Sequence, residues 1–189
     1  MKRTVILAST SPRRRELLHK VVENFDVCAP ALEQEVLDQS LDLPRALEKL
    51  ALQKAESVAN HFSEAIVIGA DTIVCKDGEL LGKPADGTEA THMLEALSGE
   101  THEVITAVAV VCHASEQIRT THGLSHVTFR SLSAADIADY IATGEPLDKA
   151  GAYGIQGEGG KFVTKLEGDF DNVVGLPTAL MAELLEGIW

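Results

Sequence analysis

Ala65-Ile66-Val67-Ile68-Gly69 is the stretch that decides the fold class. A continuous, largely β-branched run of this length is typical of a strand that is buried on both faces of a sheet. Helical patterns flank it at 44–61 and 86–99, and further apolar runs lie at 5–8 and 103–112. Because helices and strands alternate along the chain, the sequence predicts an α/β fold.

The remaining elements follow from shorter patterns and from turn residues. Ser11 is a suitable N-cap, and Pro12 suits the first position of a helix. Asp77-Gly78 predicts a hairpin turn, since this dipeptide is typical of tight β-hairpins. We further expect strands at 25–28, 73–75, 80–81, 125–130, 161–166 and 172–174, and helices from 133 to 144 and from 177 onward.

Length and charge limit the classes of function. The chain has 189 residues, which fits a single domain over 1–189 with a sizeable core. Its net charge is −13, so nucleic-acid backbones and anionic membranes repel it, and we expect neither as a partner. Any anionic ligand must therefore be held by a local group of cations.

Cysteine usage and hydropathy indicate the compartment. Cys28, Cys75 and Cys112 are far apart and form no C-x-x-C pair, so neither a disulfide framework nor a structural zinc site is predicted. The apolar stretches at 5–8 and 104–112 are too short for a signal peptide and for a membrane span, respectively. The sequence therefore predicts a soluble cytoplasmic protein.

Three arginines, Arg13, Arg14 and Arg15, occupy the first turn of the first expected helix. The N-terminus of a helix is positive, so cations there are unfavourable unless something offsets them. Together with free helix N–H groups and the hydroxyls at 9–11, these arginines describe an anion site. The alternative is a solvated basic face that neighbouring acids such as Glu16 neutralise.

Asp71 and Thr72 come directly after the apolar run 66–70. A carboxylate at the end of a buried strand is costly unless it is paired, hydrogen-bonded or bound to a metal. Ligands of α/β proteins also bind at the carboxyl ends of strands. Asp71 is therefore a candidate metal ligand or general base, and the alternative is an Asx-turn residue that accepts loop amides.

Lys54 and Lys83 are cations in unusual settings. Lys54 lies on the apolar side of its helix, near Leu50 and Val58, and such a lysine either extends to solvent or points into a cleft. Lys83 lies in Gly82-Lys83-Pro84, where the glycine permits close approach of a ligand. By itself this tripeptide is also compatible with an ordinary turn.

Residues 148–157 form a glycine-rich stretch that contains Gly151, Gly154 and Gly157. No helical pattern follows these glycines, so they are not a dinucleotide-binding fingerprint. They allow close backbone approach to a planar or phosphorylated ligand, and Gln156 offers an amide donor and acceptor that suit the edge of a nucleobase. A flexible surface loop is the alternative.

Six motifs occur along the chain in the order known from one protein family. They are Ala8-Ser9-Thr10-Ser11-Pro12-Arg13-Arg14, Gln53-Lys54-Ala55, Gly69-Ala70-Asp71-Thr72, Gly82-Lys83-Pro84, the glycine-rich stretch, and Gly168-Asp169-Phe170 with Val173-Val174-Gly175-Leu176-Pro177. In this order they closely resemble the Maf family of nucleoside triphosphate pyrophosphatases, which were first described as septum-formation inhibitors. The resemblance runs from Val5 to the last helix.

The resemblance implies a fold and an activity. The implied fold is an elongated, two-lobed α/β fold with a central mixed sheet, similar to that of the inosine triphosphate pyrophosphatases, with the nucleotide in a cleft between the lobes. The implied activity is hydrolysis of dTTP and UTP, and of modified pyrimidine nucleotides, to the monophosphate and pyrophosphate with Mg²⁺ or Mn²⁺. This is a house-cleaning role in nucleotide metabolism, and it is compatible with a homodimer.

The resemblance also implies roles for individual residues. Asp71 matches the residue that accepts the proton in this family. Other residues match positions that line the phosphate site or that distinguish the dTTP/UTP subgroup. Phosphate-site residues are matched by Ser9, Arg14, Lys54 and Lys83, and the subgroup positions by Arg13, Thr72 and Gln156. The chain departs from the usual acidic pair after the second strand, because it has Glu33-Gln34-Glu35 there. Glu33, Glu35 or Asp71 would then support the metal.

Three other functions stay open at this point. The chief rival is a regulator of septum formation or cell division that binds a nucleotide without turnover. Asp71, Lys54 and Lys83 favour catalysis, because a binder has no use for a water-activating carboxylate beside phosphate-binding cations. The subgroup residues disfavour action on 7-methyl-GTP, and a phosphomonoesterase would release orthophosphate instead of pyrophosphate.

Overall fold

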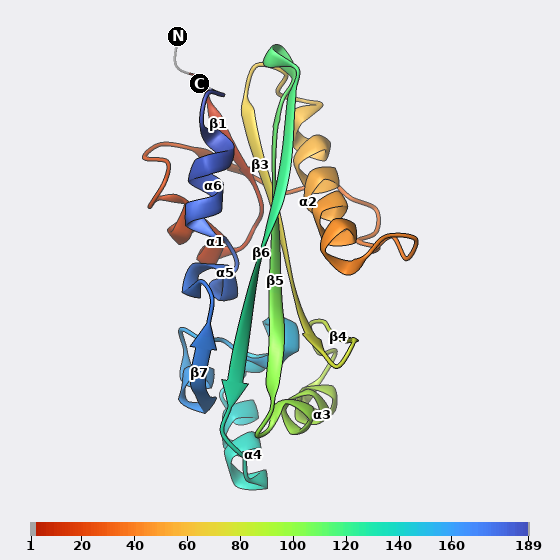
Figure 1. Cartoon of the computed structure of the whole chain (residues 1–189), viewed down its shortest axis with the longest axis vertical. Coiled ribbons are helices and arrows are strands. Elements are labelled where there is room, and N and C mark those ends of the chain that lie inside the picture. The colour runs from red at the N-terminus through yellow and green to blue at the C-terminus, as the bar shows by residue number, and fades with distance from the viewer. Residues whose placement is uncertain (1–2, 189) are drawn as a thin grey trace. The chain divides into compact units, whose positions relative to one another are not determined.

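A computed structural model describes residues 3–188 and has interleaved helices and strands (Figure 1). The strands form one seven-stranded mixed sheet in the order β2-β1-β3-β5-β6-β7, with β4 paired to β3. They are β1 (Val5–Ala8), β2 (Asp26–Cys28), β3 (Ile66–Lys76), β4 (Glu79–Leu81), β5 (Thr101–Cys112), β6 (Gln117–Phe129) and β7 (Val163–Glu167). The helices are α1 (Pro12–Leu18), α2 (Leu43–Ala59), α3 (Gly87–Leu97), α4 (Ala134–Ala142), α5 (Phe170–Val174) and α6 (Thr178–Leu185). The predicted α/β class and mixed sheet are confirmed.

The chain forms two compact units. The first contains, of the described residues, 3–71, 106–123 and 175–188, and the second contains 72–105 and 124–174. Strands β3, β5 and β6 contribute residues to both units. Of the helices within residues 3–188, none combines the length and apolarity that crossing a membrane requires. The single domain with a cleft between two lobes stays a prediction.

The first unit is built on the parallel strands β2, β1 and β3. Ala8 at the end of β1 is in register with Cys28 on one side and Gly69 on the other, so the three strands run in the same direction. Figure 1 shows α2 on one side of the long strands and α1 and α6 on the other. The predicted burial of 65–69 on both faces follows from these two layers, and Ile66, Val67 and Ile68 are fully buried.

Helix α2 approaches β3 closely because residue 69 has no side chain. A Cβ atom at Gly69 would lie 2.2 Å from the carbonyl oxygen of Ala51 and 2.8 Å from the backbone nitrogen of Ala55. Both of these partners belong to the backbone of α2, so a flexible side chain cannot relieve the overlap. The glycine therefore sets the distance between the helix and the strand, and with it the distance between Lys54 and Asp71.

Three local predictions were wrong. The strands expected at 65–69 and 73–75 are one strand, β3, which continues through Asp71 because it also pairs with β5, whereas the predicted hairpin of its end with β4 is confirmed. Strand β6 begins at Gln117, well before the expected residue 125. The expected strand at 172–174 is part of helix α5, whose first turn has a hydrogen bond from the Asp171 amide to the Asp169 carboxylate, 2.9 Å. The β-branched pair in this segment suggested a strand, but the capping carboxylate and the buried Asn172 favour a helical turn.

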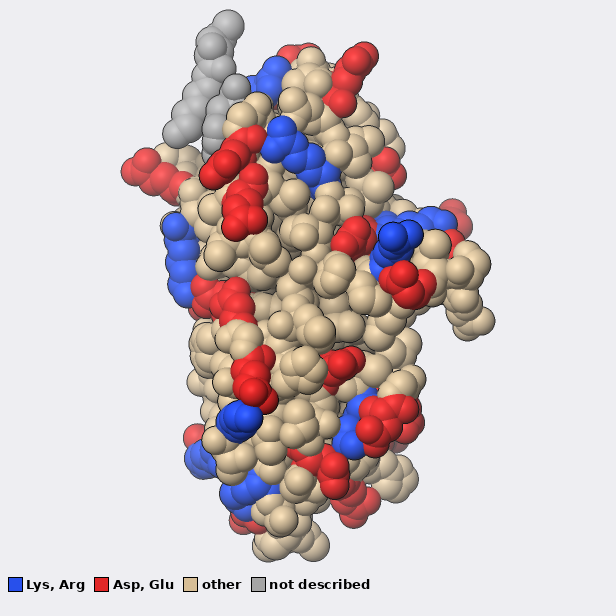
Figure 2. All heavy atoms as spheres, in the orientation of Figure 1, with Lys and Arg blue, Asp and Glu red and all other residues tan. Residues whose placement is uncertain are grey.

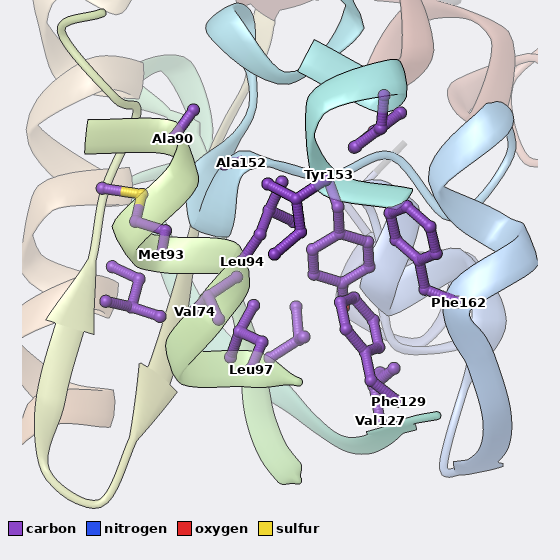
Figure 3. Packing of buried hydrophobic residues seen from close by; sticks show 14 residues of the cluster. Val74, Ala90, Met93, Leu94, Leu97, Val127, Phe129, Ala152, Tyr153 and Phe162 are labelled. Carbon is purple, nitrogen blue, oxygen red and sulfur yellow. The ribbon is translucent and has the colours of Figure 1, made fainter. Parts of the chain in front are cut away.

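The second unit has an aromatic core. Figure 3 shows the rings of Phe129, Tyr153 and Phe162 beside one another, next to the apolar side of α3. The ring centroids of Phe129 and Tyr153 are 4.7 Å apart in an edge-to-face arrangement, which is the favourable geometry for such pairs. His102 lies against both rings, and its Nε2 is 2.8 Å from the hydroxyl of Tyr153.

His102 acts in this core as a neutral hydrogen-bonding group. Burial, together with the nearby charge of Lys76, lowers the pKa of His102 to about 4. The imidazole is therefore uncharged near neutral pH, and its bond to the Tyr153 hydroxyl fixes the chain where the glycine-rich stretch begins to turn.

The close approach of α2 to β3 gives a test of stability. We expect Gly69→Ala to lower the free energy of unfolding by about 2–3 kcal/mol, because the added methyl group overlaps helix backbone that cannot rotate away. Urea unfolding followed by circular dichroism measures this change. Gly82→Ala is the control, since nothing lies within 4 Å of a Cβ atom there. Equal stability of the two variants would contradict the proposed contact.

Candidate functional site

A buried lysine between two carboxylates is the centre of the candidate site in the first unit. Lys54 is 5% exposed, although it carries a charge. Its Nζ donates to Asp71 Oδ1 at 2.7 Å and to Glu35 Oε2 at 2.9 Å. Of the two open interpretations of Lys54, the structure supports a side chain that points to ionised partners and not to bulk solvent. An ammonium carries three donors, and the carboxylates account for two of them.

The second cationic element is the turn between β1 and α1. Ser11 caps the helix as predicted, because its Oγ accepts a hydrogen bond from the backbone amide of Arg14. The Oγ of Ser9, which is 4% exposed, accepts from the backbone amide of Ser11 at 3.2 Å. Arg14 donates from Nε to the carbonyl oxygen of Gly175 at 2.9 Å and from Nη1 to Ser9 Oγ at 3.5 Å. The sequence signals did not reveal the role of the Gly175 carbonyl.

Electrostatics link Arg14 to the carboxylates around Lys54. Burial lowers the pKa of the Arg14 guanidinium, Asp71 and Glu35 raise it, and the neighbouring Arg13 lowers it. An arginine stays protonated through such shifts, so Arg14 remains a fixed cation. Since Asp71 and Glu35 act on both Arg14 and Lys54, these four groups form one cluster of mixed charge, which we call the Lys54 cluster.

The Lys54 cluster lies where the parallel strands of the first unit end. Ser9 follows β1, the segment with Glu35 follows β2, and Asp71 lies two residues beyond Gly69, the last residue of β3 in register with β1. The prediction that Asp71 ends its strand was wrong, but the parallel pairing does end beside it. The rule that ligands bind at the carboxyl ends of parallel strands therefore applies to this edge.

The structure distinguishes between the two candidate glutamates. Both glutamates are exposed, but Glu35 contacts Lys54 and Glu33 is not a partner of that lysine. Among residues 3–188, no group of three or more His, Cys, Asp and Glu side chains is arranged to hold a metal ion. A metal at the Lys54 cluster would therefore have at most the oxygens of Glu35 and Asp71 as protein carboxylate ligands. Mg²⁺ is often held by one or two carboxylates together with substrate phosphates, so this donor set fits.

Three predicted site residues belong to the second unit. Thr72 is half-buried in β3, and Lys83 and Gln156 are exposed. Two of the motifs are joined directly, because the backbone amide of Gly151 donates to the carbonyl oxygen of Gly82 at 3.0 Å. The turn with Lys83 and the glycine-rich stretch are thus neighbours within this unit.

Two residues that the sequence did not single out hold the glycine-rich stretch in place. Glu145 accepts hydrogen bonds from the backbone amides of Glu158 and Gly159, and Tyr140 accepts one from the amide of Gly154. Tyr140 lies on the apolar side of α4 and resembles an ordinary core residue in the sequence. Glu145 follows that helix without any pattern that suggests a role.

The charge of the surface sets the cluster apart. On the face seen in Figure 2, Lys and Arg side chains are scattered among more numerous Asp and Glu side chains. The chain has a net charge of −13, yet at the Lys54 cluster it holds two cations, the buried Lys54 and the half-buried Arg14. Two held cations beside two carboxylates can neutralise a phosphorylated ligand and hold a hard cation at the same place.

The fold and this cluster define an α/β protein with a site suited to a metal-bound phosphorylated ligand. The chain belongs to the family described as Maf-like protein, which matches residues 4–188. The chain is 50% identical over 179 residues to a protein of Bacillus velezensis named dTTP/UTP pyrophosphatase, covering 95% of this chain and 93% of that protein. It is 48% identical over 181 residues to a protein of Moorella thermoacetica with the same name, covering 96% and 93%. The solved structure of a Staphylococcus aureus Ham1 protein is similar with a TM-score of 0.47 and 10% identity, covering 67% of this chain and 72% of that one.

The Lys54 cluster predicts a loss of affinity when its central cation is removed. We expect Lys54→Met to weaken the binding of inorganic pyrophosphate in the presence of Mg²⁺ by about 10- to 100-fold, since a charge-assisted hydrogen bond is lost. Isothermal titration calorimetry measures the affinity. Lys49→Met is the matched control on the same helix, because Lys49 pairs with Asp38 at the exposed surface. Similar affinities in the two variants would exclude Lys54 from anion binding.

Proposed function

We propose that this protein hydrolyses dTTP and UTP to the nucleoside monophosphate and pyrophosphate, in a house-cleaning role in nucleotide metabolism. The observation that carries the proposal is the Lys54 cluster, found in a chain that is about half identical to proteins named dTTP/UTP pyrophosphatase. We extend it to modified pyrimidine nucleotides, because a site that reads the base edge tolerates changes elsewhere on the ring.

Binding of the triphosphate depends on cations that the chain already holds in place. Lys54 and Arg14 supply fixed positive charge, and the Ser9 hydroxyl lies beside Arg14. Arg13 and Lys83 are also assigned to the triphosphate. Arg13 is the other cation of the motif at 8–14, and Lys83 is the cation of Gly82-Lys83-Pro84. Interactions of this kind stabilise the charge that spreads over the phosphoryl oxygens in the transition state.

Asp71 is assigned the proton transfer. The oxygen of a water molecule attacks the α-phosphorus, the bond from that phosphorus to the oxygen bridging to the β-phosphorus breaks, and pyrophosphate leaves with the bond electrons. The water proton goes to the carboxylate of Asp71. Lys54, at 2.7 Å from Asp71 Oδ1, orients this carboxylate and balances its charge while the substrate binds.

A divalent cation, Mg²⁺ or Mn²⁺, completes the proposal. Glu35 would hold it together with the substrate phosphates, because Glu35 and not Glu33 belongs to the Lys54 cluster. When bound, such a cation neutralises phosphate charge and makes the phosphorus more electrophilic.

Recognition of the base is assigned to Gln156 and Thr72. Gln156 carries both a donor and an acceptor, as a uracil or thymine edge requires, and Thr72 adds a hydroxyl. A cytoplasmic location and a homodimer stay predictions alongside this function.

A panel of substrates tests the proposed function. We expect pyrophosphate, and not orthophosphate, to be released from dTTP and UTP faster than from CTP, GTP or 7-methyl-GTP when Mg²⁺ is present. Product identification by ³¹P nuclear magnetic resonance separates the two anions. Release of orthophosphate would indicate a phosphomonoesterase, and tight nucleotide binding without any turnover would favour a regulatory binder.

Replacement of Asp71 tests its role. We expect Asp71→Asn to lower kcat for UTP by about 10²- to 10⁴-fold while KM changes little, because an amide cannot accept the proton from water. Steady-state kinetics measure both constants. Asp26→Asn is the control, since Asp26 is an exposed carboxylate of the same unit. A kcat for Asp71→Asn near that of the control would remove Asp71 from the mechanism.

A further inference from the structure

The stretch 154–159 of the second unit has an exposed tip on a fixed base. Gln156 and Gly157 are exposed, whereas Gly154 and Gly159 on either side of them are buried. Two backbone hydrogen bonds close the turn, one from the Gly157 amide to the Gly154 carbonyl at 3.2 Å and one from Gly160 to Gly157 at 3.1 Å. We call this stretch the Gln156 turn. Its position depends on what holds its two buried ends.

One carboxylate and one phenol hold both ends. Glu145 Oε2 accepts from the amide of Glu158 at 2.9 Å, and Glu145 Oε1 accepts from the amide of Gly159 at 3.3 Å. The other end is held by Tyr140, whose hydroxyl oxygen accepts from the amide of Gly154 at 3.1 Å. The same hydroxyl donates to Glu145 Oε1 at 2.8 Å, so the two ends are connected through a single chain of hydrogen bonds.

The surroundings make this connection rigid. Tyr140 is 4% exposed, and its ring packs edge-to-face on Phe162 with the centroids 5.0 Å apart. The main chain of Glu145 is held as well, because Lys149 Nζ donates to its carbonyl oxygen at 2.9 Å. Burial acts to raise the pKa of Glu145, but the bonds from the Glu158 amide, the Tyr140 hydroxyl and the Gly159 amide, together with the charge of Lys149, outweigh it and lower the pKa overall. The carboxylate is therefore ionised near neutral pH and acts only as an acceptor.

A free glutamine is a poor discriminator between pyrimidines. Its amide presents a donor on one side and an acceptor on the other, and rotation by half a turn exchanges them. Thymine and uracil have an acceptor at position 4 and cytosine has a donor there, so a glutamine that can move or rotate can fit either base. A fixed backbone limits where the glutamine amide can lie relative to the base, and in this way it contributes to discrimination.

We infer that Glu145 is a positioning residue that fixes the Gln156 turn through Tyr140 and the amides of Glu158 and Gly159, and that it thereby sets the choice among bases. The inference rests on the proposed function, because it concerns how that function selects its substrate. Glu145 does not touch the substrate in this assignment, and it acts only through Gln156.

The exchange Glu145→Gln replaces one of the two acceptor oxygens by an NH2 donor without changing the size of the side chain. All three partners of this carboxylate are donors, and an amide group has only one oxygen to offer them. We expect the ratio of kcat/KM for UTP to kcat/KM for CTP to fall about tenfold, mainly through a higher KM for UTP, while kcat changes less than about threefold. Asp139→Asn, at an exposed position next to Tyr140, makes the same chemical exchange and should leave the ratio unchanged.

A double variant shows whether Glu145 acts through Gln156. Gln156→Ala alone should reduce the same ratio, and adding Glu145→Gln should reduce it no further, because the side chain that the turn positions is already absent. Amide hydrogen exchange is the second readout, and we expect the amides of Gly154, Glu158 and Gly159 to exchange at least about tenfold faster in Glu145→Gln. Tyr140→Phe, which loses the bond from the Gly154 amide and the bond to Glu145, should show the same changes to a smaller degree. If Glu145→Gln does not fold, Tyr140→Phe serves as the test variant in its place.

The outcomes separate the inference from the proposed function. If the wild-type protein releases pyrophosphate selectively and Glu145→Gln is folded and equally selective, the inference is wrong and the function stands. The inference is equally wrong if amide exchange in the Gln156 turn is unchanged, or if Glu145→Gln lowers selectivity further in the Gln156→Ala protein. If the wild-type protein releases pyrophosphate from none of the nucleotides, the proposed function fails first and the inference fails with it.

Discussion

The first unit depends on the contact between the backbone of α2 and strand β3 at Gly69. Any side chain there would overlap the carbonyl of Ala51 at 2.2 Å, so only glycine allows the helix to lie at this distance. Lys54 lies within one turn of Ala51 on the helix, and Asp71 lies two residues from Gly69 on the strand. The 2.7 Å bond between their side chains is a consequence of that packing. A helix further from the sheet would leave a charged lysine buried without its partner.

Burial makes the Lys54 cluster costly for stability and useful for chemistry. Removing an ammonium and a carboxylate from water costs several kcal/mol in general, and the attraction between them offsets this only in part. Apolar side chains of similar size would pack at least as well at these positions. The cluster lies at the carboxyl ends of the parallel strands, where a ligand that needs fixed charge of both signs would find it already in place. A triphosphate with its metal is such a ligand, and an acidic protein binds it only where cations are held locally.

Local sequence signals predicted the class of fold and the position of most elements. The Ser11 cap and the β-branched run at 65–69 were sufficient, because capping and two-sided burial are decided by a few neighbouring residues. They failed where distant partners decide. The sequence predicted the hairpin of 73–75 with 80–81, but it did not show that β3 is one strand through Asp71, beside the distant β5 in the sheet. The helix at 170–174 was missed because the buried amide of Asn172 bonds to Val104 and Ser125, far away in the sequence.

In the candidate site, too, local signals predicted some features, and distant contacts decided the others. The residue types that bear charge were recognisable, since arginines in a first helical turn and a lysine on an apolar helix face break the usual patterns. Which glutamate meets Lys54 was not predictable, because it depends on the path of the segment after β2. Glu145 and Tyr140 gave no signal at all, because each is ordinary in its own element and becomes significant only through the amides it accepts.

Glu145 also limits how the Gln156 turn can be redesigned or can diverge. A Cβ atom at Gly157 would lie 2.5 Å from the carboxylate oxygens of Glu145, and one at Gly159 would lie 2.6 Å from the Tyr140 hydroxyl. A side chain at either glycine would thus displace the acid or the phenol from its present position. Random replacement of Gln156 alone would change the side chain that the turn presents, but the shape of its support would persist. A new turn shape requires simultaneous changes on α4, in the residues after it and in the glycines, which makes it difficult to reach by single steps.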